Sequence, residues 1–148
     1  MNLFRTALSA FLILAAVPTL AAEWIPIEGT DRHFDKSRIR TESGGIIRVW
    51  QKAVLKDYVI KELENDLRRN GTPIDYSGYS FSIELWEMNR NQDTYAVRQG
   101  ASYAENGRVI ASFELENVRF ESVTPESEGD LAFRAVCDYV SKKIKSVR

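Results

Sequence analysis

Residues 76–89 read YSGYSFSIELWEMN and form the longest β-strand pattern in the chain. Side chains alternate between the two faces of a strand, so Phe81, Ile83 and Leu85 share one face. Trp86 and Met88 fall on the opposite face, among polar neighbours. Residues 89–93 then turn the chain into a second strand pattern at residues 94–103. The middle of the chain is therefore predicted to be β-sheet.

A third strand pattern follows after a hairpin turn. Glu105-Asn106-Gly107 is typical of such turns, because asparagine and glycine tolerate the positive φ angles that they require. The returning strand is predicted over residues 108–123, with an interruption near Glu116-Asn117. Three consecutive strands with short connections predict an antiparallel meander.

The residues before the meander supply two more strands and a helix. Residues 24–27 suit a strand that Pro26 confines to an edge or an opening position. Residues 41–45 form a turn before a strand at 46–54, whose two faces carry Ile47, Val49 and Gln51 on one side and Arg48, Trp50 and Lys52 on the other. Residues 56–70 change to helical spacing, with Ile60, Leu63 and Leu67 on one face and a stop at Asn70-Gly71. Charges of both signs on the other face predict a short, half-buried helix.

The last element is predicted to be a long helix. Ser127 and Asp130 have the spacing of a capping box, with aspartate in place of the usual glutamate. One helix face carries Phe133, Val136, Cys137, Val140 and Ile144, and basic residues gather at the end. We expect this helix to lie across one face of the sheet, which makes the fold class α+β.

The first 22 residues have the layout of a secretory signal peptide. Arg5 gives a basic start, residues 7–17 are apolar apart from one serine, and small residues lead to Ala22. About eleven apolar residues are too few to span a bilayer core. We predict cleavage after Ala22, with Ala21 as the alternative, which leaves a single domain at residues 23–148. No cysteine lies near the cut, so a lipid anchor is excluded and a soluble periplasmic or secreted protein is predicted.

Composition narrows the classes of partner. The chain has 20 basic and 21 acidic residues and a net charge of −1, which becomes about −2 without Arg5. Nucleic acids and anionic membrane surfaces call for a concentrated basic face, so neither is an expected partner. A hydrophobic content of 44% and a charged content of 28% suit a packed domain. Stable insertion of the mature chain into a membrane is not expected.

Few residues are candidates for chemistry. The sequence has one histidine and one cysteine, which excludes an internal disulfide and a multi-histidine metal site. His33 lies two residues from Asp35, yet no second histidine or adjacent nucleophile accompanies it. The carboxylate pairs Glu84/Glu87 and Glu126/Glu128 suggest glycoside hydrolysis, but Glu84 and Glu87 point to opposite faces of a strand. The prediction is therefore a protein without catalytic residues, cofactor or metal site, and with binding residues unassigned.

Cys137 has two interpretations. An odd cysteine in an exported protein suggests an intermolecular bridge or a free thiol. Its place on the apolar helix face favours a buried, inert thiol. The aromatic residues have two interpretations as well, since outward-facing rings would suit a protein interface, whereas core and cross-strand pairing is their commoner use. They are Tyr76, Tyr79, Trp86, Tyr95 and Tyr103.

Several of these marks together resemble the surface-adhesin protein E family of small exported bacterial proteins. They are Trp24-Ile25, Phe34-Asp35, Ile39, Val49-Trp50, Lys52, Gly71, Trp86-Glu87-Met88-Asn89, Asn106-Gly107, Pro125-Glu126-Ser127 and Val136-Cys137. The resemblance spans the whole mature chain and implies an antiparallel sheet of about six strands with a C-terminal helix packed on it. It further implies adhesin-like binding of host proteins and a homodimer. Relatives commonly carry a second cysteine near Asn89-Arg90, where this chain has none.

The resulting functional prediction is an exported, non-enzymatic binding protein that acts by contact with a host or envelope protein. Recognition would use the edge or the face of the sheet. The alternative is a periplasmic module that holds a small apolar ligand or peptide between sheet and helix. A cavity lined by the helix face at residues 133–140 would favour that alternative, and a solid core there would remove it. An enzyme that uses His33 or a carboxylate is the third hypothesis.

Overall fold

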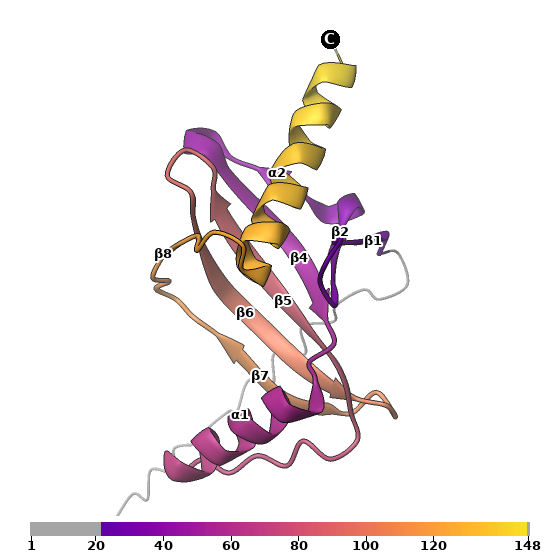
Figure 1. Ribbon diagram of the computed structural model, residues 1–148, viewed down its shortest axis with the longest axis vertical. Helices are drawn as coiled ribbons and strands as arrows, with labels where there is room; N and C mark the ends of the chain where they lie inside the picture. The colour runs from indigo at the N-terminus through magenta and orange to yellow at the C-terminus, as the bar shows by residue number, and fades with distance from the viewer. Residues whose placement is uncertain (1–21, 148) are drawn as a thin grey trace, which may run out of the picture.

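The computed structural model describes residues 22–147, which form an antiparallel sheet with two helices (Figure 1). The strands are β1 (Trp24–Pro26), β2 (Arg32–Asp35), β3 (Arg40–Thr41), β4 (Ile46–Ala53), β5 (Tyr79–Asn89), β6 (Thr94–Ala104), β7 (Val109–Glu114) and β8 (Glu121–Ser122). The helices are α1 (Asp57–Arg69) and α2 (Glu128–Ser146), and short 3₁₀ turns occur at η2 (Lys36–Arg38) and η3 (Ser43–Gly45). The predicted α+β class is confirmed. The expected signal peptide at residues 1–22 falls almost wholly outside the described residues.

The main path of the sheet contains six strands in the order β1-β2-β4-β5-β6-β7. The two shortest strands lie beside this path, with β3 on β4 and β8 on β6. All pairs are antiparallel, and β5, β6 and β7 form the predicted meander. At the hairpin between β6 and β7, Gly107 has φ 82°, the left-handed conformation that the turn requires. The predicted strand at 108–123 is interrupted as expected, and residues 115–120 separate β7 from β8.

The core lies between α2 and the face of the sheet beneath it. Figure 1 shows α2 lying across the strands, with its last turns extending past the end of the sheet. Ile47 and Val49 of β4 pair with Met88 and Trp86 of β5, and all four side chains are buried on this face. The helix contributes Ala132, Phe133, Val136 and Val140 to the same cluster. The face of β5 that carries Trp86 and Met88, rather than Phe81 and Leu85, is therefore the one that α2 covers.

The other face of the sheet is held by rings and ion pairs. Phe81 and Tyr103 stack across β5 and β6 with ring centroids 5.1 Å apart. The Lys52 ammonium lies 4.4 Å from the centroid of the Phe81 ring, within the range of a cation–π contact. On the same face, Glu87 is buried between Arg48 and Arg98 and forms an ion pair with each of them.

The end of α2 departs from the prediction. Phe133, Val136 and Val140 are buried as expected, but Ile144 is 44% exposed. Ile144 is exposed because the helix is longer than the sheet beneath it, so that its last turns extend past the strands, as Figure 1 shows. Helical spacing identifies one face of a helix but contains no information about where the neighbouring sheet ends.

The predicted cap of α2 is present in a modified form. The Ser127 hydroxyl oxygen accepts the N–H of Asp130 at 3.1 Å. The Asp130 carboxylate accepts the N–H of Glu126 at 2.9 Å, whereas in the usual capping box it would bind the N–H of the cap residue. Glu126 has φ 64°, and this left-handed turn lets its N–H reach the shorter aspartate side chain. Asp130 also pairs with Arg134 one turn further on.

Candidate functional site

The residues that suggested catalysis are dispersed by the fold. His33 lies on β2 opposite Pro26 of β1 and Lys52 of β4. Asp35 is fully buried and points into the start of η2, where its carboxylate caps the turn and pairs with Arg38. In the described part of the chain, no hydrogen bond or ion pair joins His33 to Asp35. The arrangement does not bring a base, an acid and a nucleophile together around the histidine.

The two glutamates of β5 lie on opposite faces, as predicted. On the α2 side, Glu84 accepts the indole N–H of Trp86 at 2.8 Å and pairs with Arg32 at 3.1 Å. The Arg32 guanidinium also lies over the Trp86 ring, 5.1 Å from its centroid. Glu87, on the other face, is enclosed by its two arginines. Each carboxylate is thus paired with arginine on its own face of the sheet, so the two glutamates do not face each other across a cleft as glycoside hydrolysis requires.

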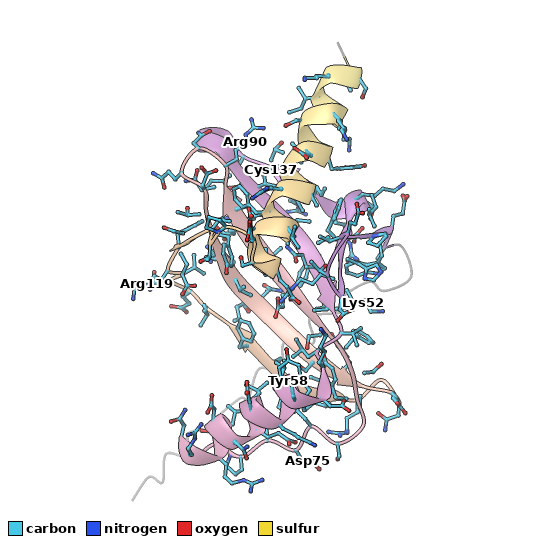
Figure 2. All side chains as sticks on the ribbon, viewed as in Figure 1. Lys52, Tyr58, Asp75, Arg90, Arg119 and Cys137 are labelled. Atoms are coloured by element: carbon cyan, nitrogen blue, oxygen red, sulfur yellow. The ribbon has the colours of Figure 1, made fainter. Side chains whose placement is uncertain are left out.

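Cys137 is a half-buried free thiol near the turn between β5 and β6. Burial raises its pKa to about 11, and the charge of Arg90 on the turn opposes that rise. Figure 2 shows Arg90 and Cys137 close together at the same end of the sheet. A thiol with such a raised pKa is almost fully protonated at neutral pH, so it is a poor nucleophile.

Metal binding would need a cluster of candidate ligands, and membrane crossing by a helix depends on the character of the two helices within residues 22–147. No group of three histidine, cysteine, aspartate or glutamate side chains there is placed to hold a metal ion. In the same range, neither helix combines the length and the apolar character that crossing a membrane requires. On the helix face at residues 133–140, Phe133 and Val136 pack into the core, whereas Val140 both belongs to the core and, with Tyr139, lines a groove at the end of the sheet.

The least protected feature of the sheet is its edge at β7. This strand pairs with β6 on one side and has no strand on its other side among the described residues. Its six residues, VIASFE, include no proline and one charge. Apolar side chains remain exposed along the strand and the connection after it, namely Val109 (51%), Phe113 (47%), Leu115 (45%) and Phe120 (37%). We call β7 and residues 115–120 together the β7 margin.

The register shows which main-chain groups of β7 are free. The Leu115 N–H donates to the Arg98 carbonyl at 2.8 Å, so Leu115 faces β6. Main-chain groups of successive residues point alternately to the two sides of a strand, so Ser112 and Glu114 direct their N–H and C=O groups outward. The Ser112 side chain is exposed, which leaves this part of the edge accessible.

The opposite edge of the sheet is protected. β1 is three residues long and ends at Pro26, which has no N–H to offer a further strand. Its start is held by Glu23, whose N–H donates to Asp35 at 3.1 Å and whose carboxylate pairs with Lys36 at 2.6 Å. A short edge strand that contains proline is a known protection against unwanted pairing. The sequence predicted both strands and placed only residues 24–27 at an edge or an opening position, whereas the strand order shows that β7 is an edge as well.

Comparison with models of known protein families gives no match, and comparison with curated proteins gives none either. The likeness to the protein E family therefore stays a prediction from the motifs.

Proposed function

We propose that this is an exported, non-enzymatic binding protein, similar to protein E, that takes an extended segment of a partner protein as an additional strand on β7. The observation that carries the proposal is the free outer edge of β7. In strand addition, main-chain hydrogen bonds provide affinity and alternate side chains provide selectivity. Ser112 and Glu114 would supply the main-chain groups, and the exposed Val109 and Phe113 would contact the side chains of the partner.

The position of the edge supports this mechanism over recognition by the sheet face. An edge strand rich in β-branched and aromatic residues is a template for further pairing unless charge or proline prevents it. The other face of the sheet offers Phe81 and Tyr103, but these rings stack on each other and Lys52 covers one of them. The β7 margin is the larger group of exposed apolar side chains and it adjoins free main-chain groups.

A proline substitution at an outward-facing residue tests strand addition directly. Ser112→Pro removes an N–H that points away from β6, so we expect the fold to be retained. The same variant should lose the partner, because the pairing hydrogen bond is gone and the proline ring obstructs the edge. Ser112→Ala is the matched control, since it keeps the N–H. Binding is measured by capture from cell-envelope extracts and from host plasma on the three immobilised proteins.

The expected result is a set of proteins that the original chain and Ser112→Ala retain and that Ser112→Pro loses. Hydrogen exchange should then show protection of the Ser112 and Glu114 amides in the complex. Equal capture by all three proteins would contradict recognition at β7, and no capture by any of them would contradict the binding function. Cell fractionation, with the mass of the exported form, tests the predicted cleavage after Ala22.

A further inference from the structure

A groove with a volume of about 400 Å³ lies between the last turns of α2 and the segment that runs from η2 to β3. It lies outside the solid core, at the end of the sheet that α2 overhangs. Its walls are Ile39 and Thr41 on one side and Tyr139, Val140, Lys143, Ile144 and Val147 on the helix side. Thr41 pairs with Ile47, which places it on the face of the sheet that α2 covers.

The groove presents apolar side chains that nothing in the described chain covers. Val140 marks the limit of the core with 4% exposure, and beyond it Ile144 is 44% exposed and Val147 is 82% exposed. Ile39 on the opposite wall packs partly against the core. These side chains face one another across a hollow, so a narrow apolar group between them would be covered on two sides. A volume of this size is within the usual range for small-molecule sites.

Lys143 is the one charged residue in the walls of the groove, and it has no carboxylate partner within residues 22–147. Other cations of the region do have partners, as in the pairs Lys36–Glu23 and Arg134–Asp130. The helix neighbours of Lys143 on the same face are Tyr139 and Val147, which carry no negative charge. Lys145 adds a second positive charge in the last turn, which offsets the partial negative charge of the helix end.

We propose that this groove binds a single-chain aliphatic carboxylate, with its hydrocarbon tail between Ile39 and Ile144 and its carboxylate on the Lys143 ammonium. A volume of about 400 Å³ lies at the small end of the range for small-molecule sites, which suits one hydrocarbon chain of medium length. A medium-chain fatty acid such as decanoate has this size. The site is independent of the β7 margin and extends the proposed function to a ligand.

Other occupants fit the walls less well. A peptide would bring several main-chain N–H and C=O groups against walls whose polar residues are Thr41, Tyr139 and Lys143, and unpaired polar groups are costly to bury. A bilayer surface would need apolar side chains that form one outward-facing layer, whereas Ile39 and Ile144 line a hollow from two different elements. A single chain with one anionic group matches both the shape and the unpaired cation.

The test uses decanoate, neutral 1-decanol and cationic decyltrimethylammonium as probes with the purified protein. Methyl resonances of Ile39, Ile144 and Val147 are followed by NMR, and affinities are taken from the titrations. We expect decanoate to shift these resonances, 1-decanol to bind more weakly at the same place, and the cation to bind least. Lys143→Glu should weaken decanoate binding by about tenfold and leave 1-decanol binding unchanged, because it reverses only the charge at the head group.

Lys145→Glu is the matched control, since it makes the same change of charge on a residue outside the walls, and it should alter decanoate affinity less than twofold. Ile144→Ser should weaken both decanoate and 1-decanol, and circular dichroism should show an intact helix. Decanoate binding that shifts other resonances, or that responds equally to the two lysine variants, would overturn the proposal. It would also be overturned if no probe bound at millimolar concentration, or if the groove resonances changed with protein concentration alone, which would indicate a second copy as the occupant.

Discussion

The part of the sheet under α2 and the β7 margin contain similar residues in opposite situations. Phe133 of α2 is 6% exposed and packs against the buried strands, whereas Phe113 of β7 is 47% exposed at the edge. Both come from strongly apolar patterns, one helical and one β. The difference is that α2 has a sheet face to cover, while β7 has a neighbour on only one side within residues 22–147. Apolar residues are thus buried in the core at one place and remain exposed to solvent at the other.

The largest expected difference comes from the same substitution at these two phenylalanines. Phe133→Ala should lower the free energy of unfolding by about 3–5 kcal/mol, because it leaves a cavity in the core. Phe113→Ala should lower it by less than about 1 kcal/mol, because the ring is half in solvent already. Urea denaturation of both variants measures the two losses. Equal losses would show that the β7 margin belongs to the core and is not a free edge.

Asp35 provides the next test, in the part of the sheet near α2. Its Oδ1 accepts the Glu23 N–H, the Ser37 N–H at 3.0 Å and the Ser37 hydroxyl at 2.6 Å, and its Oδ2 pairs with Arg38. Asp35→Ala should cost about 2–3 kcal/mol at pH 7, since hydrogen bonds to a charged group are lost. Glu114→Ala, on exposed β7, should change stability by less than about 0.5 kcal/mol.

Asp35 should also contribute to acid denaturation. Burial acts to raise its pKa, but the hydrogen bonds from Ser37, Arg38 and Glu23 outweigh burial and hold the pKa below the usual 3.8. The folded state then binds fewer protons than the unfolded state in acid, so this contribution is full above pH 3.8 and is lost as the pH falls through the lowered pKa. Between pH 7 and pH 2.5, the free energy of unfolding should therefore fall less steeply with decreasing pH for Asp35→Asn than for the original protein. The same pH dependence in both proteins would contradict a lowered pKa for Asp35.

A substitution at Gln51 should raise the free energy of unfolding, by less than the substitutions at Phe133 and Asp35 lower it. It is fully buried on the α2 side of β4, and neither atom of its amide has a hydrogen-bond partner in the described chain. Gln51→Met has a similar volume and no unpaired polar atoms, so it should raise the free energy of unfolding by about 1–2 kcal/mol. Gln99→Met, on half-buried β6, is the control and should give a smaller change. Destabilisation by Gln51→Met would indicate that the amide has a partner, such as a bound water molecule.

The last prediction concerns the chemical reactivity of the Cys137 thiol. With a pKa of about 11, the Cys137 thiol should react with iodoacetamide slowly at pH 8, and the rate should rise up to about pH 11. Ser112→Cys in a Cys137→Ala background places an exposed thiol on β7 for comparison. Because an ordinary thiol has a pKa of about 8.5, this reference should react about 100-fold faster at pH 8. Both alkylation rates are followed by mass spectrometry. Similar rates for Cys137 and for the reference thiol would show that Cys137 is accessible and activated.

Local patterns in the sequence predicted β1, β4, the strands of the meander and both helices, but they did not predict β2 or β3. The spacing of Ile47, Val49 and Gln51 predicted one face of β4 correctly, and the turn at Asn106-Gly107 is present. The cap at Ser127 was predicted too, because it depends on residues three positions apart. Such features are local, so a single sequence contains the information for them.

The features that the sequence missed depend on residues that are distant in the chain. Asp35 and Gln51 were not recognised as buried, since their burial depends on strands and a helix that lie elsewhere. An aspartate two residues before Ser37, in a turn, was an available sign of the cap at Asp35. The exposure of Ile144 and the groove beside it depend on where the sheet ends. The helical repeat of apolar residues gives no information about the position of that end.

By itself, the amino-acid order determined the kind of the longer elements and the side chains that share a face, because backbone preferences and periodicity act over a few residues. It also predicted that apolar residues lie on both faces of β5. Only the tertiary structure decided which of these faces α2 covers and which end of the sheet α2 overhangs. It also decided that, among the described residues, β1 and β7 are the two edges of the main sheet. These outcomes are set by the packing of segments far apart in the chain, where burial of apolar surface at one place leaves similar surface exposed at another.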